Sequence, residues 1–525
     1  MAAERHVVSP WVVTFAVMLA TFMELLDTTV VNVSIPQIAG TLGGSIEEGT
    51  WVVTSYLVAN AIVLPMSGWL ALYFGRKRLL MLCIAGFTVS SLFCGLSRGL
   101  DALIFFRVVQ GLTGGGLQPL AQAIMLESFP KEKHGHAMAA YAVGIMFAPI
   151  IGPTLGGWIT DQYTWPWIFY LNLPVGIFSL IMVSRTVTDP HYILRPRGGV
   201  DLWGIGFLAL GFGTLQVVLD TGQRKDWFSS DYIRVFTLLC VAGLVLFVFR
   251  ELTARHPVVD LRALRDRSFS AGVFLIFLIG FVLYASLVLL PVYVQTLLGY
   301  PALEAGLALS PRGVGSLLLT PLVGYLTPKL GPRRLTIFGL LLGGWTMLQL
   351  SALNLNAGYW DIFWPQVLQG AALPFLFIPI MAAAVAHIPN EGMGNATSII
   401  NLVRNIGGSF GIAMMTTFIA RRTQVHHNRL AENITGYDEG TRQLLEGMRQ
   451  WFLQHGADSY TAAQRSLGAA YMILQRHAAM LSFVEAFWVM AAVFAGMILL
   501  VPLLRDPRKN RKSPPRGPAR QAAHA

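Results

Sequence analysis

The sequence predicts an all-α membrane protein with fourteen transmembrane helices, and its composition leads to that prediction. Hydrophobic residues make up 54% of the 525 residues, charged residues only 12%, and the mean hydropathy is +0.57. Soluble proteins are about 25% charged, and a single hydrophobic core stops growing near about 250–300 residues. This chain therefore has more apolar surface than one core can bury, and lipid must cover the rest.

Fourteen runs of mostly apolar residues are long enough to cross a bilayer, which takes about 20 residues of helix. The first run contains Glu24 and Asp27, which the apolar region of a cleaved signal peptide avoids, so we expect it to remain as a helix. The predicted spans are 11–33, 50–72, 78–97, 102–126, 136–159, 166–184, 201–219, 232–250, 269–292, 302–326, 334–354, 362–386, 396–420 and 480–504.

Basic residues predict the orientation of the spans, because Lys and Arg are concentrated in cytoplasmic loops. If residues 1–10 are cytoplasmic, the inner loops hold most of the basic side chains, and both termini are cytoplasmic. The tail 505–525 is rich in Arg, Lys and Pro, and it serves either as a topology anchor or as a contact for anionic lipid. The basic inner-loop residues are Arg76, Lys77, Arg78, Lys131, Lys133, Arg185, Arg195, Arg197, Arg255, Arg262, Arg265, Arg267, Lys329, Arg333 and Arg334.

One outer segment, residues 421–479, is long for a connection between two spans. Within it Leu444 and Trp451 fall on one helical face, and Leu467 and Tyr471 repeat the spacing of an amphipathic helix. We therefore expect an outer loop with two amphipathic helices. These helices form a hairpin over their own bundle, lie on the lipid surface, or dock a partner protein.

The chain carries an internal repeat, which is common in transporters with a substrate path between two halves. The repeat predicts two six-helix bundles, 11–184 and 269–504, with two inserted helices over 201–250. A proline is expected to end the first helix of each half. The matching pairs are Pro36 and Pro291, Gly68 and Gly324, and Gln110-Gly111 and Gln369-Gly370, at separations of 255, 256 and 259 residues.

Ionisable residues inside predicted spans are costly in lipid, and each is a hypothesis about function. Glu24 and Asp27 lie three residues apart, on one face of the first helix. A carboxylate there can hold either a proton or a cationic substrate, which is the minimum for coupled exchange. Arg107 and Arg404 are expected to balance these charges, and each of the four residues has a purely structural alternative. Arg312 is placed near a helix end, from which its side chain is expected to reach the membrane surface.

The fifth span is rich in glycine and proline, with Gly152, Pro153, Gly156 and Gly157 close together. Small residues four apart let two helices approach closely, and proline bends a helix. We therefore expect tight packing here, and the bend is expected either to gate movement or to serve packing alone.

Sequence motifs of enzymes and ATPases are absent. No Walker A sequence is present, and the largest hydrophilic segment has only 59 residues, too short for an ATPase domain. No HExxH sequence and no Cys/His cluster occurs. We therefore expect a protein that is not an enzyme and needs no metal or cofactor. Its energy comes from an ion gradient, or the process is passive. A non-transporting receptor is the alternative of a different class.

Four motifs resemble those of the major facilitator superfamily, specifically its 14-span drug:proton antiporters of the EmrB/QacA type. The resemblance covers about residues 10–505. It departs at Leu72 and Tyr73, where the family has an acidic and then a basic residue, which is expected to weaken the charge pairing of that loop. The matching motifs are LDTTVVNVSIP (Leu26 to Pro36), Gly68, Gly75, Arg76 and Lys77 after the second span, Arg107, Gln110 and Gly111 in the fourth, and Gly152, Pro153, Gly156 and Gly157 in the fifth.

This resemblance implies a major-facilitator fold and a proton-coupled multidrug efflux transporter that exports hydrophobic or amphipathic compounds by alternating access. The strings FMELLDTTVVNVSIPQIAG and QVHHNRLAE are similar to the EmrB branch of the family. That similarity implies a place in the cell inner membrane, with a periplasmic adaptor of the EmrA type and a TolC-like outer-membrane channel as partners. Asp27, with Glu24, is then expected to bind the proton. The alternative is a dedicated exporter of one endogenous metabolite, such as a siderophore or an antibiotic.

Overall fold

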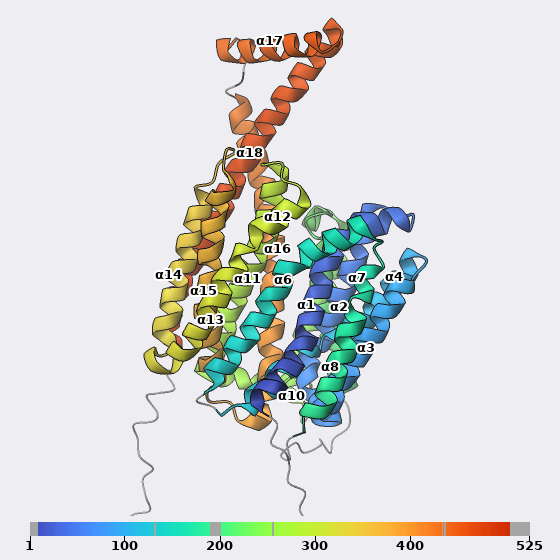
Figure 1. The fold of residues 1–525 in the computed structure, drawn as a ribbon, viewed down its shortest axis with the longest axis vertical. Helices are drawn as coiled ribbons and strands as arrows, with labels where there is room; N and C mark the ends of the chain where they lie inside the picture. The colour runs from blue at the N-terminus through green and yellow to red at the C-terminus, as the bar shows by residue number, and fades with distance from the viewer. Residues whose placement is uncertain are drawn as a thin grey trace, which may run out of the picture.

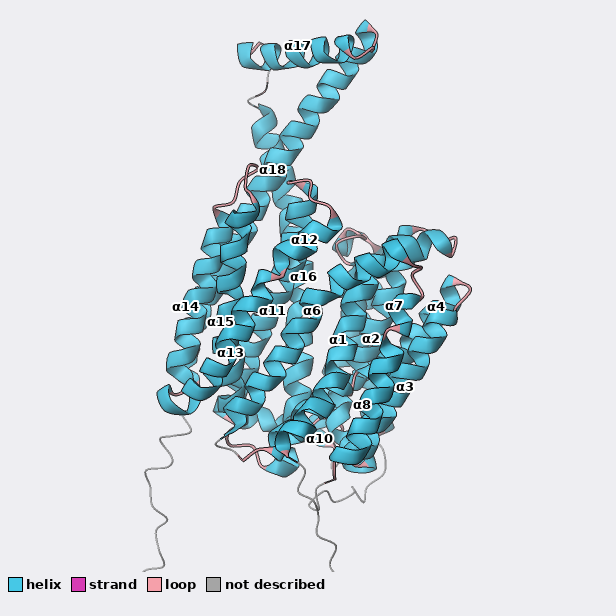
Figure 2. Ribbon diagram, in the orientation of Figure 1, coloured by secondary structure: helices cyan, strands magenta, loops and turns pink. Residues whose placement is uncertain are grey.

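Helices are the only regular elements in the part of the chain that the computed structural model describes (Figure 2). That part comprises residues 9–130, 133–189, 201–254, 257–432, 434 and 437–504. The predicted all-α class is therefore confirmed for these residues. Most of the predicted N-terminal segment 1–10 and the predicted tail 505–525 lie outside them.

The helices form two bundles side by side, with two further helices between them in the chain (Figure 1). The first bundle contains α1 (Pro10–Thr41), α2 (Ile46–Phe74), α3 (Arg76–Leu96), α4 (Leu100–Gly114), α5 (Leu117–Ser128), α6 (His134–Gln162), α7 (Trp167–Tyr170) and α8 (Asn172–Thr186). The inserted pair is α9 (Leu202–Thr221) and α10 (Asp231–Thr253). The second part contains α11 (Arg267–Thr296), α12 (Ala302–Leu309), α13 (Pro311–Leu330), α14 (Pro332–Ser351), α15 (Tyr359–Val385), α16 (Met393–Glu432), α17 (Glu439–Gln454) and α18 (Ser459–Ile498). Short 3-10 helices lie at Trp227–Ser229, Leu261–Arg265, Asn390–Gly392 and Val501–Leu503.

The described helices are suited to a membrane. Eleven helices or successive helix pairs are long and apolar enough to cross one. The helices α6, α14 and α16 pack against members of that set, namely α1, α15 and α11. Together these elements lie at the positions of the fourteen predicted spans.

Three of the predicted spans are each divided into two helices, which corrects the expectation of continuous ones. The breaks separate α4 from α5, α7 from α8 and α12 from α13. At the first break a Cβ on Gly115 would lie 2.7 Å from the backbone oxygen of Asn60, and one on Gly116 would lie 2.9 Å from the Cys83 sulfur. Glycine is required there because α2 and α3 pack directly against the turn.

Proline does not end the first helix of either half, contrary to the prediction. Pro36 lies inside α1, which continues to Thr41, and Pro291 lies inside α11, which continues to Thr296. Membrane helices tolerate proline where neighbouring groups satisfy the freed carbonyls. Both helices end five residues after the proline, so the internal repeat includes the ends of these two helices.

Segment 421–479 is not a loop but a helical projection. α16 continues to Glu432 and α18 begins at Ser459, so both helices extend beyond the bundle and carry α17 across their tips. Figure 1 shows α17 at the top, away from both bundles, which excludes a hairpin folded over its own bundle.

Aspartates cap the starts of α17 and α18. Backbone and side-chain hydrogen bonds from Thr441 lower the pKa of Asp438, and those from Thr461 lower the pKa of Asp458. A cap whose folded-state pKa is lowered stabilises the helix at neutral pH, and this contribution is lost as the pH falls through that pKa. The projection is therefore capped by charged groups at neutral pH.

Close glycine contacts between the bundles follow the internal repeat. A Cβ on Gly68 of α2 would lie 2.8 Å from the backbone oxygen of Gly394 in α16, and one on Gly135 of α6 would lie 3.3 Å from that of Gly324 in α13. Gly135 and Gly394 are 259 residues apart, the separation found for Gln110 and Gln369. Both contacts lie at the end of the molecule opposite α17, which we call the glycine end.

One glycine in each bundle lets two helices of that bundle pack closely. A Cβ on Gly111 would lie 2.4 Å from the backbone oxygen of Tyr56, and one on Gly370 would lie 1.8 Å from that of Arg312. Tyr56 and Arg312 are also related by the repeat, 256 residues apart. Both bundles therefore use the same helix contact, α2 with α4 and α13 with α15.

We predict that Gly111→Ala destabilises the protein by about 1–3 kcal/mol, the usual effect of overpacking. The added methyl group meets backbone, which cannot move aside as a side chain can. Thermal unfolding of the purified protein in detergent measures the effect. Gly206→Ala in α9 is the control, because nothing lies within 4 Å of the added carbon there. Equal unfolding temperatures for the two variants would contradict the prediction.

Candidate functional site

Two carboxylates of α1 are buried one turn apart in the first bundle. Glu24 is 3% exposed and Asp27 is 1% exposed. Helix α1 packs against α2, α5, α6 and α8, so several of its faces lie inside the protein. The two acids face different neighbours.

Asp27 is held in an ion pair with Arg107 of α4. Arg107 Nη1 lies 2.6 Å from Asp27 Oδ2, and both side chains are fully buried. The other carboxylate oxygen accepts hydrogen bonds from Asn172 Nδ2 at 2.7 Å and from Gln110 Nε2 at 3.2 Å. The charge of Asp27 is therefore balanced, and both of its oxygens are satisfied.

Arg107 also binds α2 and a neighbour on its own helix. Its Nε donates to the backbone oxygen of Val52 in α2 at 2.9 Å, and its Nη1 donates to Gln110 Oε1 at 2.8 Å. Its guanidinium carbon lies 4.3 Å from the centre of the Tyr56 ring, a favourable cation–π arrangement. The four helices α1, α2, α4 and α8 therefore meet around one buried charge pair.

Glu24 has fewer partners. Its Oε1 accepts a hydrogen bond from Asn60 Nδ2 at 3.1 Å and lies 3.4 Å from the Tyr56 hydroxyl. Its Oε2 is buried without a hydrogen bond to any described residue. Among the described residues Glu24 has no ion-pair contact, so its charge is not neutralised as that of Asp27 is.

Arg404 of α16 connects the second bundle to this region. It is 3% exposed, and its guanidinium donates to the side chain of Gln118 in α5. Gln118 lies beside Glu24, and Arg404 attracts the Glu24 carboxylate electrostatically. Polar groups therefore run from Glu24 through Gln118 to Arg404, across the boundary between the bundles.

Four site residues were not among the sequence candidates: Tyr56, Asn60, Gln118 and Asn172. All four are uncharged, whereas the search considered ionisable residues. Amide side chains inside apolar spans are the signal that identifies three of them, because lipid offers a buried amide no hydrogen bond.

Hydrogen bonds close the boundary between the bundles toward the glycine end. Ser67 and Ser398 lie 2.8 Å apart, and Thr397 donates to the backbone oxygen of Pro119 at 3.1 Å. Asn401 Nδ2 donates to Gln122 Oε1 at 2.6 Å. The residues of α16 in these contacts share one face with Arg404, so this face is the surface that α16 presents to the first bundle.

The motif after the second span forms a turn anchored by charge. Gly75 adopts φ +86°, a conformation that favours glycine, and the Lys77 amide donates to Asp189 Oδ1 at 2.8 Å. Lys77 Nζ donates to the backbone oxygen of Ser184 at 2.6 Å. Arg76 is buried in an ion pair with Glu127 of α5. A charge pair therefore remains in this region although the family's acidic residue is absent at Leu72.

The glycines of the fifth span pack α6 against α1. A Cβ on Gly152 would lie 1.9 Å from Thr29 Oγ1, and one on Gly156 would lie 3.0 Å from the Val30 backbone oxygen. Gly157 faces open space, and the side chain of Pro153 lies outside the described residues. The α1–α6 contact therefore depends on Gly152 and Gly156.

Arg312 does not reach the membrane surface, which corrects the prediction. The pair α12–α13 places it inside a longer span, where it is 3% exposed. Its Nε donates to Gln366 Oε1 at 3.0 Å and its Nη2 to Gln369 Oε1 at 2.5 Å. Amide oxygens, rather than an acid, therefore surround this charge.

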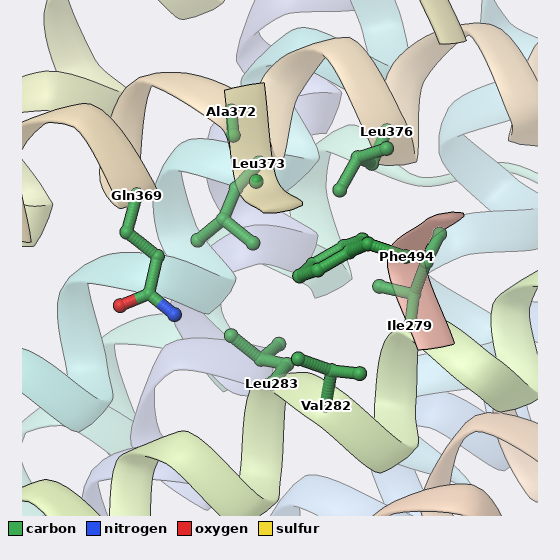
Figure 3. Close-up of a pocket in the computed structure, with 9 residues that line it drawn as sticks. Ile279, Val282, Leu283, Gln369, Ala372, Leu373, Leu376 and Phe494 are labelled. Carbon is green, nitrogen blue, oxygen red and sulfur yellow. The ribbon is translucent and has the colours of Figure 1, made fainter. Parts of the chain in front are cut away.

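The second bundle lacks the acids of the first. Ile279 and Val282 stand where the repeat separation of 255 residues places the counterparts of Glu24 and Asp27. Figure 3 shows both beside a small void lined by apolar side chains and by Gln369. No group of three or more metal-ligating side chains occurs in the described ranges. The carboxylate chemistry of the described core is therefore in the first bundle.

Comparisons with known proteins identify the family of the chain. The sequence profile of the Major Facilitator Superfamily matches residues 17–412. The chain is 36% identical over 501 residues to the multidrug export protein EmrB of Escherichia coli K12, covering 94% of this chain and 95% of that protein. It is 34% identical over 500 residues to the fatty acid resistance protein FarB of Neisseria gonorrhoeae, covering 94% of this chain and 96% of that one.

Solved structures show the same fold at low identity. A double-tryptophan mutant of XylE superposes with a TM-score of 0.61 at 14% identity, covering 95% of this chain and 96% of that one. The human organic anion transporter MFSD10 gives a TM-score of 0.60 at 13% identity, covering 94% and 99%. The chain therefore belongs to the Major Facilitator Superfamily, among its EmrB-type drug transporters.

Proposed function

We propose that this chain is a proton-coupled multidrug efflux transporter of an inner membrane, which exports hydrophobic or amphipathic compounds by alternating access. The observation that carries the proposal is the buried carboxylate of Glu24. It contacts α2 in its own bundle and lies within electrostatic reach of Arg404 in the other. A proton or a cationic compound bound at Glu24 therefore acts on both bundles, which is the requirement for coupling binding to their relative movement.

The direction of transport follows from the orientation that the basic loops predict. If the glycine end faces the cytoplasm, the described arrangement is closed toward the cytoplasm. In this state a proton reaches Glu24 from the periplasmic side. When the bundles rock and the glycine end opens, a compound from the cytoplasmic side competes with that proton for Glu24.

Asp27 has a different part in this scheme. A proton on Asp27 would leave Arg107 buried without a counter-charge, and breaking a buried pair costs about 3–5 kcal/mol. We therefore assign the exchange to Glu24 first. The Asp27–Arg107 pair holds α1, α4 and α8 in fixed positions around it.

We also propose that the projection docks a periplasmic adaptor of the EmrA type, which leads to a TolC-like channel. Leu444 and Trp451 are 46% and 53% exposed on one face of α17, beyond both bundles (Figure 1). Exposed aromatic and aliphatic side chains grouped on one helix face are typical of interaction sites. The position of α17 supports this occupant over the chain's own bundle.

We predict that Glu24→Gln abolishes dye movement driven by a pH gradient in proteoliposomes. Glutamine keeps the hydrogen bond from Asn60 but does not exchange a proton, so dye binding also loses its pH dependence. Glu304→Gln is the control, because that carboxylate is exposed at the start of α12. Dye-dependent proton release that persists in Glu24→Gln would disprove the assignment.

We predict that Asp27→Asn lowers the free energy of unfolding by about 3–5 kcal/mol, because Arg107 is left buried without an acid. Thermal unfolding in detergent measures the loss. Asp27→Asn combined with Arg107→Gln removes both charges and is expected to recover part of it. If Asp27→Asn is as stable as the wild type but loses proton release, Asp27 rather than Glu24 is the exchanging group.

We predict that Leu444→Ser with Trp451→Ser leaves dye transport in proteoliposomes unchanged but removes drug resistance in cells that contain the adaptor. The change is confined to the projection, so it affects only docking. Tyr437→Ser is the control, since Tyr437 is 94% exposed in the connection before α17. Unchanged resistance and unchanged adaptor co-purification in the double variant would contradict docking at this face.

A further inference from the structure

The inserted helix α9 lies against both bundles on one side of the molecule. It packs on α2 and on α16. Toward α2, Asp220 accepts a hydrogen bond from Thr54, and Arg224 Nη1 donates to Thr50 Oγ1 at 2.5 Å. The backbone at Gly213 also meets Ile62, whose Cδ1 would lie 3.4 Å from an added Cβ. α9 is therefore seated firmly on the first bundle.

The same helix reaches the second bundle. Ser409 donates to Gln216 Oε1 at 3.1 Å, and Trp227, just after α9, donates its indole NH to Thr417 Oγ1 at 2.9 Å. We call the boundary between α2 and α16 the covered seam, because α9 bridges it.

α10 covers α9 and presents an apolar face to the lipid. It packs on α9, and its outer face exposes large apolar side chains. Leu238 is 71% exposed, Val245 62% and Phe249 68%. Such a surface is suited to lipid, so α9 and α10 together form a two-helix layer between the membrane and the α2–α16 boundary.

The opposite boundary, between α6 and the pair α12–α13, has a different construction, and we call it the open seam. Small residues make close contacts there: Gly135 meets Gly324, and a Cβ on Gly306 would lie 3.0 Å from Thr154 Oγ1. In Figure 1, α6, α12 and α13 lie toward the viewer, and the inserted pair is faded behind the bundles.

Large apolar side chains border the open seam on its membrane face. Phe147 of α6 is 37% exposed, and Leu317 and Leu318 of α13 are 38% and 69% exposed. Leu317 lies two helical turns before Gly324, on the same face of α13. When Gly135 and Gly324 separate at the glycine end, this border leads directly from lipid to the space between the bundles.

We propose that membrane-dissolved amphipathic cargo enters laterally from the bilayer through the open seam, while the inserted helices keep the covered seam shut. This inference rests on the proposed efflux function and adds the route to it. The cargo it fits is a lipophilic cation, because the border is apolar and Glu24 lies inside. The inserted pair confines loading to one side of the molecule.

Photolabelling of the full chain in lipid nanodiscs tests the route without any need for a proton gradient. The probe is a photoactivatable derivative of a lipophilic cationic dye, and its adducts are mapped by mass spectrometry with and without excess unmodified dye. We expect competed adducts on α6, α12 and α13. The proposal would be overturned if excess dye reduced labelling on α9, α10 or the α2–α16 boundary. It would also be overturned if excess dye reduced labelling at no position.

A pair of variants separates entry from binding. Leu317→Trp narrows the open seam and is expected to lower the initial rate of gradient-driven dye transport several-fold, with dye affinity in detergent unchanged. Leu238→Trp on the outer face of α10 is the matched control and leaves both values unchanged. Equal rates for the two variants would overturn the route. Absence of gradient-driven transport in the wild type would instead contradict the proposed function, whatever the labelling pattern.

Discussion

The first bundle depends on the neutralisation of one buried charge. A guanidinium is costly to bury in a medium of low dielectric constant unless it is paired, and Arg107 has Asp27 at 2.6 Å. The remaining groups follow from that pair: Asn172 fixes the second carboxylate oxygen, Val52 offers its carbonyl to Nε, and the Tyr56 ring covers the guanidinium. Because these partners come from four helices, the helices cannot shift independently without exposing a charge. The bundle therefore moves as one body, and Glu24 is carried on it in a fixed position one turn away.

The two halves share their packing but not their charges. The repeat preserves the helix ends at Thr41 and Thr296 and the glycine contacts within and between the bundles. At the centre it replaces Arg107 with Gln366 and Tyr56 with Arg312. Both halves therefore keep the packing contacts, whereas apolar Ile279 and Val282 take the positions of Glu24 and Asp27 in the second half. The second bundle then contributes through Arg404, whose charge reaches across the boundary to Glu24.

Hydropathy and spacing predicted the helices, because a membrane allows few alternatives to a helix of about 20 apolar residues. The same reasoning failed where a contact between residues distant in the sequence determined a helix break or the burial of a side chain. The break at Gly115 depends on Asn60, and the burial of Arg312 depends on Gln366 and Gln369. For the candidate site, the charged residues were identifiable because charge is rare in a span. Asn60 and Gln118 were not identifiable, because the role of an amide depends on the carboxylate or guanidinium that lies beside it in the fold.

The inserted helices place a mechanical condition on any rocking of the bundles. α9 is bound to α2 and to α16, so a change in the distance between those helices must break one set of contacts. The set on α2 includes the acceptor Asp220, the donor Arg224 and close packing at Gly213, whereas the set on α16 consists of the hydrogen bonds from Ser409 and to Thr417. If the bundles rock as proposed, we expect the weaker set to yield first, so that α9 travels with the first bundle and slides along α16. A sliding contact of this kind would keep the α2–α16 boundary covered while the glycine contact between α6 and α13 opens, which is the asymmetry that the proposed route requires.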